Sequence, residues 1–388
     1  MRGGQAARIV VLLIAGCLGA GAAHGQLHGH MSMAKEVYLA GEPIYVHFEV
    51  TNVGKDPVQF VANDPYNAAC GEYRVEVSKD AVKEPSYCAA PMGEPLRCDG
   101  GVQILPSGET ARQNVLVNYA HDVTKAGTYE IHATRVVTYG PVSQEFAIPS
   151  SRQKYEVQAR FRIEVVKGDP EALKSIYKVY LTNLESDDTD IQREAERAIV
   201  SGAPPWLEDT IEGMVRRSSS REFALLGLKN LNTERSRARL AEIAQNAPEY
   251  TEQNEAAVGY LAELGDKKYF PVLLEIAKRQ EADQGREYIV AAAELGGADA
   301  LPYLQELLSS NEKDARANGV AGLGVTGSRD AVPVLLGAMK NGDAELRKLA
   351  VQSLQELTHH DGEAGNWESW WDAHKDSANL YGWRECAR

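Results

Sequence analysis

The stretch Leu323–Leu357, LGVTGSRDAVPVLLGAMKNGDAELRKLAVQSLQEL, predicts two amphipathic helices joined by a short turn. Gly327 lies six residues before Pro333, and the turn sequence NGD separates the apolar run after the proline from a second apolar run. Glycine often ends a helix in the left-handed conformation, and proline in the first turn of a helix costs no hydrogen bond. The stretch therefore predicts one helical hairpin.

The same hairpin recurs upstream at a fixed spacing. Gly265 and Gly296 also lie six residues before a proline, so the Gly–Pro pair returns every 31 residues (296 − 265 and 327 − 296). A fixed period of this length is typical of solenoids, in which stacked hairpins bury one another's apolar faces. We predict a helical solenoid over residues 171–357, with about five to six helical pairs and irregular first units.

The second helix of the quoted hairpin has an apolar and a polar face. By helical periodicity its apolar face holds Leu346, Leu349, Ala350, Leu354 and Leu357. Its polar face holds Glu345, Arg347, Lys348 and Gln352. We take these four polar residues as candidates for a binding surface. The sequence does not separate the inner from the outer side of the stack.

The pattern of this hairpin resembles the HEAT-type helical repeat, close to the variety found in phycobilisome-lyase-like proteins. The resemblance implies a curved solenoid that presents a long surface to a partner protein or peptide. Within residues 358–388, the tail NWESWWDAH resembles the Trp-rich segment that often follows the last repeat, and implies a cap built by Trp367, Trp370 and Trp371. An aromatic platform for a ligand is the alternative for these tryptophans.

Residues 36–166 have the period of strands instead. In IYVHFEV, the apolar residues Ile44, Val46, Phe48 and Val50 alternate with polar ones, as in half-buried strands. Turn sequences such as AGEP, NVGKDP and LPSGE separate the strands. Short alternating strands with such turns predict an antiparallel β-sandwich ahead of the all-α solenoid.

The sandwich sequences YLAGEPIYVHFEVTNVGKDPVQF, YRVEV, LPSGET and AGTYEIHA resemble the Ig-like domain of the bacterial intracellular proteinase inhibitor family. The resemblance implies an Ig-like fold. It also implies an alternative function, inhibition of a proteinase through an exposed loop, for which the long, Pro-rich segment Glu84–Asp99 is the candidate.

Residues 1–25 have the organisation of an export signal. The basic segment MRGGQAAR is followed by the apolar segment IVVLLIAGCLGAGAA and by small residues before Gln26. IAGC, ending at Cys17, also resembles a bacterial lipobox, which implies lipidation of Cys17 and a membrane anchor as the alternative. We expect an exported chain, periplasmic or in the cell envelope, with residues 26–35 as a leader.

The charge of the chain argues against two classes of partner. Without residues 1–25, the formal charge changes from −14 to 39 − 55 = −16, because Arg2 and Arg8 are lost. Such a surface repels phosphate, so we expect no nucleic-acid partner, and membrane association only through a lipidated Cys17. A basic or neutral protein partner fits the charge.

Four cysteines remain after removal of the signal: Cys70, Cys88, Cys98 and Cys386. An even number of cysteines in an exported chain predicts disulfides rather than a metal site, since no CxxC spacing occurs. Three pairings are open. Cys88 and Cys98 bracket a short Pro/Gly loop and form one candidate bond, which would leave Cys70 for Cys386.

The sequence contains no recognisable catalytic motif. GxSxG, HExxH and Gly-rich phosphate loops are all missing, so we predict no catalytic residue, no cofactor and no enzymatic activity. An unrecognised metal-dependent enzyme is the alternative. Its weak candidate ligands are His359, His360 and Asp361, which we interpret as a surface loop before the cap.

A second group of ligand-type residues lies near the predicted mature N-terminus and contains His28, His30, Met31 and Met33. Copper and zinc bind such side chains, but we interpret the group as part of the leader. Together these patterns predict an exported, non-catalytic scaffold that binds a protein through a helical-repeat surface.

Overall fold

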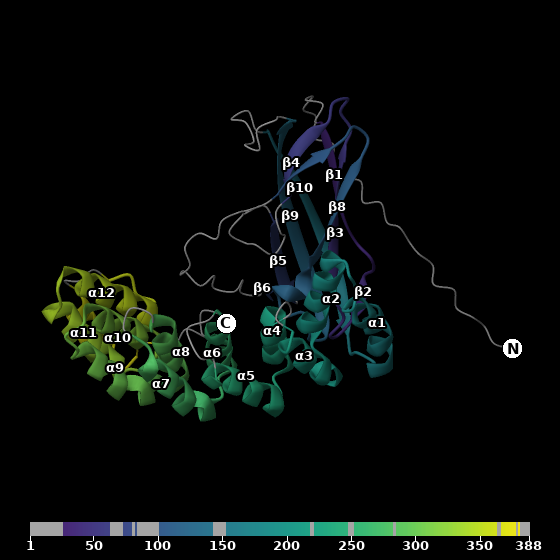
Figure 1. Ribbon diagram of the computed structural model, residues 1–388. Coiled ribbons are helices and arrows are strands. Elements are labelled where there is room, and N and C mark those ends of the chain that lie inside the picture. The colour runs from purple at the N-terminus through teal and green to yellow at the C-terminus, as the bar shows by residue number, and fades with distance from the viewer. Residues whose placement is uncertain are drawn as a thin grey trace.

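The structure is a computed structural model of the chain. It describes residues 26–62, 73–79, 82–83, 101–142, 153–217, 221–246, 252–281, 285–362, 366–377 and 379–380. Figure 1 shows a β-domain that rises from the N-terminal end of an arc of helices. The predicted order, sheets followed by a helical solenoid, is confirmed.

The β-domain contains two sheets. The smaller sheet has the order β1 (Leu27–Met33), β3 (Tyr45–Asn52), β8 (Thr110–Leu116). The larger sheet has the order β2 (Val37–Leu39), β10 (Gln153–Val166), β9 (Gly127–Pro141), β4 (Val58–Ala62), β7 (Gly101–Leu105). β5 (Tyr73–Lys79) also pairs with β9, and β6 (Val82–Lys83) pairs with β5. The described pairings are antiparallel except β2 with β10, which makes the larger sheet mixed.

The predicted leader, residues 26–35, is wrong. Residues 27–33 form β1, which pairs with β3 along its whole length and places Leu27 and Met31 in the core of the β-domain. The sequence does not show the apolar–polar alternation of this strand because Gly29 occupies one of its inward-facing positions. A Cβ there would lie 2.3 Å from Cγ2 of Val157, so only glycine lets β1 pass this close to β10.

Twelve helices of the described chain form six antiparallel pairs. They are α1 (Pro170–Asn183), α2 (Thr189–Gly202), α3 (Glu208–Val215), α4 (Arg221–Leu231), α5 (Glu234–Asn246), α6 (Glu252–Leu264), α7 (Phe270–Arg279), α8 (Arg286–Gly296), α9 (Leu301–Leu308), α10 (Lys313–Val325), α11 (Ala331–Asn341) and α12 (Ala344–Thr358). A shorter helix, α13 (Trp367–His374), follows them. None of the helices described is long and apolar enough to cross a membrane.

Every even-numbered helix of the six pairs is followed by a residue with positive φ. These residues are Ala203, Asn232, Gly265, Gly297, Gly327 and His359. They are spaced by 29, 33, 32, 30 and 32 residues (232 − 203, 265 − 232, 297 − 265, 327 − 297, 359 − 327). The left-handed residue thus marks all six units, including the first ones, which lack the Gly–Pro pattern.

One repeat glycine has a different role from the one expected. Gly297, not Gly296, has positive φ, whereas Gly296 is the last residue of α8. A Cβ on Gly296 would lie 2.4 Å from the ring of Phe270 in α7. Gly296 is therefore required by packing, and its neighbour turns the chain.

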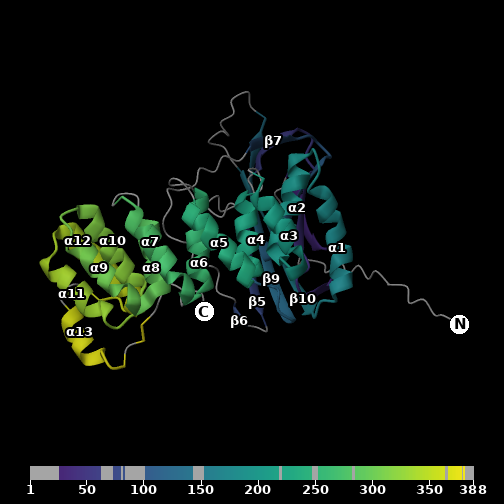
Figure 2. The same ribbon diagram turned by 60° about the horizontal axis from the view of Figure 1, so that its bottom comes forward.

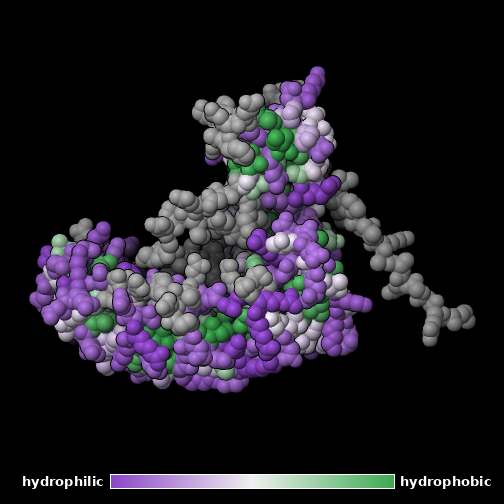
Figure 3. Space-filling view, in the orientation of Figure 1, coloured by the Kyte–Doolittle hydropathy of each residue, from purple (hydrophilic) through white to green (hydrophobic). Residues whose placement is uncertain are grey.

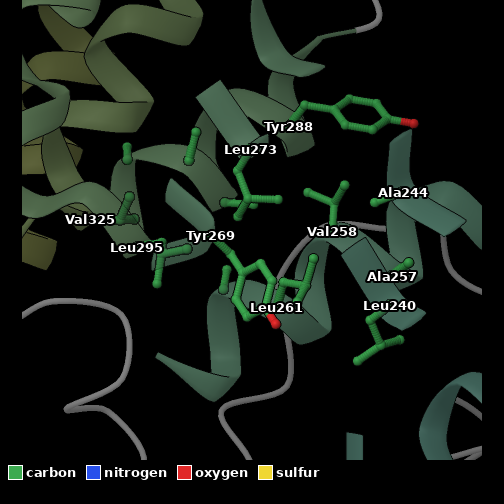
Figure 4. Packing of buried hydrophobic residues seen from close by; sticks show 14 of the residues in the cluster. Leu240, Ala244, Ala257, Val258, Leu261, Tyr269, Leu273, Tyr288, Leu295 and Val325 are labelled. Atoms are coloured by element: carbon green, nitrogen blue, oxygen red, sulfur yellow. The ribbon is translucent and has the colours of Figure 1, made fainter. Parts of the chain in front are cut away.

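Odd- and even-numbered helices share one continuous core. Figure 4 shows Leu240 of α5, Val258 and Leu261 of α6, and Leu273 of α7 converging in it. Each of these side chains is at most 1% exposed. Full burial of such a side chain contributes about 1.5–3 kcal/mol, so stacking of the units stabilises helices that would not form alone.

The β-domain packs directly on the first helical pair. The hydroxyl of Tyr177 in α1 donates to the carbonyl of Gly41 over 2.8 Å, and its ring meets Trp206 edge-on at 5.6 Å. Burial raises the pKa of the Tyr177 phenol, so this hydroxyl stays protonated and remains a donor. The contact covers the N-terminal end of the solenoid with the β-domain (Figures 1 and 2).

Candidate functional site

The helices form two layers with different spacing. Even-numbered helices approach one another closely because glycines face their neighbours. A Cβ on Gly322 of α10 would lie 2.5 Å from Cδ2 of Leu304 and 3.4 Å from Cβ of Ala293 in α8, and one on Gly324 would lie 2.9 Å from Cβ of Ser353 in α12. The closer layer is the shorter one and lies on the inside of the arc (Figure 1).

One side of each inner helix remains uncovered by described residues. α8 packs against α6, α7 and α10, which leaves Glu287, Val290 and Glu294 exposed or half-buried on its fourth side. The same reasoning applies along the layer. We call the resulting surface the inner face, and it consists of Ala256, Gly259, Glu263, Glu287, Val290, Glu294, Asp314, Ala317, Ala321, Glu345, Lys348, Gln352 and Glu356.

The inner face is acidic and has small apolar residues along its middle. Six of its thirteen residues are carboxylates and one, Lys348, is basic. Figure 3 shows that hydrophilic residues dominate the visible surface of the arc. A long, curved surface that no described residue encloses suits the binding of another chain better than the enclosure of a small molecule.

Crowding affects one carboxylate of this face. The pKa of the Glu356 carboxyl is raised because surrounding protein excludes water from it, although part of the side chain stays exposed. The charge of Arg286, from α8, acts in the opposite direction. Glu356 of α12 is therefore affected by a charge on α8, although α10 lies between these two helices.

The four predicted binding residues on α12 point in different directions. Gln352 and Glu345 lie on the inner face, and Glu345 pairs with Lys313 of α10. Arg347 instead donates from Nε to the carbonyl of Met339 over 3.1 Å and so caps α11. Lys348 is exposed on the inner face as well, between Glu345 and Gln352. The packing of α12 against α10 and α11 decides which of these residues face the inner side and which contact α11.

The weak metal candidates belong to the C-terminal turn. His359 has φ +50 and ends α12, and the ring of His360 stacks on Trp370 with centroids 4.4 Å apart. Asp361 is exposed. Across the described ranges, no three His, Cys, Asp or Glu side chains gather as metal ligands, and this includes His28 and His30, which project outward from β1.

The tryptophans of α13 close the end of the helical core. Trp367 is fully buried and donates from Nε1 to the carbonyl of Gly362 over 3.0 Å, and Trp371 is 8% exposed. The ring of Trp370 is stacked by His360 and also by His374, at 4.9 Å. This arrangement favours a cap over an aromatic platform for a ligand.

Several predicted site residues lie outside the described residues. They are Cys17, Cys70, Cys88, Cys98 and Cys386, together with the segment Glu84–Asp99.

Residues 301–364 match the family of HEAT repeats. This match spans α9 to α12, so the last two helical pairs are HEAT repeats, as the sequence pattern predicted. HEAT repeats typically mediate protein binding. No curated protein matches this chain.

Among solved structures, the complex of CpcE and CpcF of phycocyanin lyase from Nostoc is similar at 16% identity, with a TM-score of 0.29 over 52% of this chain and 82% of that one. Alpha-2-macroglobulin from E. coli is similar in its native form (10% identity, TM-score 0.19) and after trypsin activation (11%, 0.18). These two matches cover 85% and 90% of this chain but 25% and 28% of the macroglobulins. Such weak likenesses establish no function.

Proposed function

We propose that this protein is an exported, non-catalytic scaffold that binds a partner protein or peptide through the inner face of its HEAT-type solenoid. The observation that carries the proposal is the inner layer, one side of which no described residue covers and which runs into the HEAT match at residues 301–364. The β-domain closes one end of this layer and α13 the other, so the surface between them is the long one available to a partner.

Export rests on the segment 1–25 and is compatible with the fold. The backbone carbonyl of Gln26 accepts from the amide of Val53 over 2.9 Å, and its side chain donates to the carbonyl of Asp56 over 2.8 Å. Cleavage after Gly25 therefore leaves the β-domain intact. Lipidation of Cys17 is the alternative, and outside the cytoplasm the four remaining cysteines would pair as disulfides.

Photo-crosslinking tests the scaffold function with two matched positions. A photoreactive residue replaces Gln352 on the inner face, and in a second variant it replaces Gln305, which is exposed on the odd-numbered helix α9. In the cell envelope we expect one identifiable partner crosslinked through position 352 and none through 305. The intact mass of the recovered chain should correspond to a chain whose first residue is Gln26. Equal crosslinking at both positions, or none at 352, would contradict the proposal.

A further inference from the structure

We propose that the inner face receives a cationic segment of the partner, one that carries lysine or arginine side chains. The inference rests on the scaffold function and adds the chemistry of the partner. It follows from an imbalance of charge between the two layers of the solenoid.

Several acidic residues on the outer side of the solenoid are paired with basic residues of the same or the next unit. Asp209 of α3 pairs with Arg235 of α5 at 2.7 Å, and Glu212 of α3 with Arg239 of α5 at 3.4 Å. The pattern continues with three further carboxylates, and their pairs are Glu234–Lys268, Asp266–Arg237 and Glu275–Arg279. The outer layer thus neutralises most of these charges, whereas Glu306 of α9 makes no ion pair with a described residue.

Carboxylates of the inner face are balanced only in part. Glu263 pairs with Lys229 and Glu345 with Lys313, but Glu287 and Asp314 make no ion pair with any described residue. These two carboxylates without counterions add to the negative potential of the surface, which a cationic partner would neutralise.

Arg286 of α8 acts on Glu356, but two further arginines of the inner helices are directed elsewhere. Arg316 of α10 donates to the carbonyls of Ser310 and Asn311, over 3.0 and 2.9 Å, and Arg347 of α12 donates to that of Met339. Arg347 thus caps the end of α11, and Arg316 is bound to the turn between α9 and α10. The negative charge of the inner face is therefore fixed by the packing.

A second observation comes from the seam between α6 and α8. Oε1 of Glu255 is buried and has no hydrogen-bond partner among the described residues. A buried carboxylate oxygen without a donor is costly and calls for an explanation. The charges of Glu255 and Glu287 both act on Tyr288, whose pKa burial and these charges raise to about 12. The carboxylates of Glu255 and Glu287 thus add to the negative potential on the same side of α8, which a guanidinium or ammonium group of a partner would offset.

The middle of the inner face admits a chain at close range. Ala256, Gly259, Val290, Ala317 and Ala321 have short side chains, and a Cβ on Gly259 would meet no heavy atom within 4 Å. Apolar stems of lysine or arginine can lie along such residues while their charged groups reach the flanking carboxylates.

The test uses a fluorescein-labelled peptide of repeated Lys-Ala-Leu-Ala units and its counterpart with glutamate for lysine. Both are titrated with the mature chain and followed by fluorescence anisotropy. We expect the lysine peptide alone to bind, more weakly as salt rises, and about tenfold more weakly to the double variant Glu287→Gln/Glu356→Gln. Both substitutions preserve side-chain size at exposed positions, and thermal melting followed by circular dichroism checks that the fold is kept.

The matched control removes the same charge from the outer layer, with Glu275→Gln and Glu306→Gln in α7 and α9. Binding should then change by less than about twofold, since the lost charges do not face the peptide. Equal weakening by the two double variants, or binding of the glutamate peptide, would overturn the inference. So would a partner that crosslinks at position 352 but is insensitive to salt and to Glu287→Gln/Glu356→Gln, although the scaffold function would then stand. Peptide binding at the inner face without any crosslinked partner would instead contradict the scaffold function alone.

Discussion

Replacement of Trp367 by alanine is expected to lower the free energy of unfolding of the C-terminal units by about 3–5 kcal/mol. Trp367 is fully buried in the helical core, meets Trp370 edge-on at 5.5 Å and donates to Gly362. Its removal would leave a large cavity at the end of the stack. Because each unit of a solenoid is stabilised by its neighbours, the loss should spread into α11 and α12.

Urea unfolding followed by circular dichroism measures this loss, and hydrogen exchange shows whether α11 and α12 open first. Gln352→Ala is the control, because it changes an exposed residue of the adjacent helix and should shift stability by at most about 0.5 kcal/mol. A loss below about 1 kcal/mol for Trp367→Ala would show that α13 is not part of the core.

Replacement of Gly202 by valine is expected to separate the β-domain from the solenoid. A Cβ at this position would lie 2.0 Å from the hydroxyl of Tyr177 and 2.4 Å from the carbonyl of Gly41, the two groups whose hydrogen bond joins the domains. The carbonyl belongs to the backbone and cannot rotate away. We expect a loss of about 2–3 kcal/mol and two unfolding transitions in place of one.

Gly213→Ala is the matched control for this variant. Gly213 lies in α3, and a Cβ there would meet no heavy atom within 4 Å. Alanine should therefore stabilise the helix by up to about 1 kcal/mol, since it restricts the unfolded chain and has the higher helix propensity. If both glycine variants behaved alike in calorimetry, the close contact between the two domains would not exist in solution.

The period of the solenoid could be predicted because Gly265 and Gly327 occupy the left-handed positions that end α6 and α10. The earlier units could not be aligned from the sequence, since Asn232 and Ala203 take the same conformation without being glycine. Asparagine tolerates positive φ, whereas alanine adopts it only where the surrounding structure enforces it. A positive φ that is imposed on alanine by tertiary contacts cannot be recognised from a single sequence.

From the sequence, the candidate site could be predicted only as the polar face of one helix, α12. The polar side of α12 followed from its periodicity, but Arg347 and Gln352 look equivalent there. Their separation depends on the carbonyl of Met339, which attracts Arg347 to α11. The charge balance of the outer layer is also invisible in the sequence, because its ion pairs join residues of successive units, such as Glu212 with Arg239.

The central claim is that the inner face is where this protein meets its partner, and hydroxyl-radical footprinting tests it most directly. Val290 on the inner face and Val272 on α7 are both half-buried and react by the same chemistry. In the presence of the partner crosslinked through position 352, oxidation of Val290 should fall and that of Val272 should stay unchanged. Protection of Val272, or of neither valine, would contradict the claim.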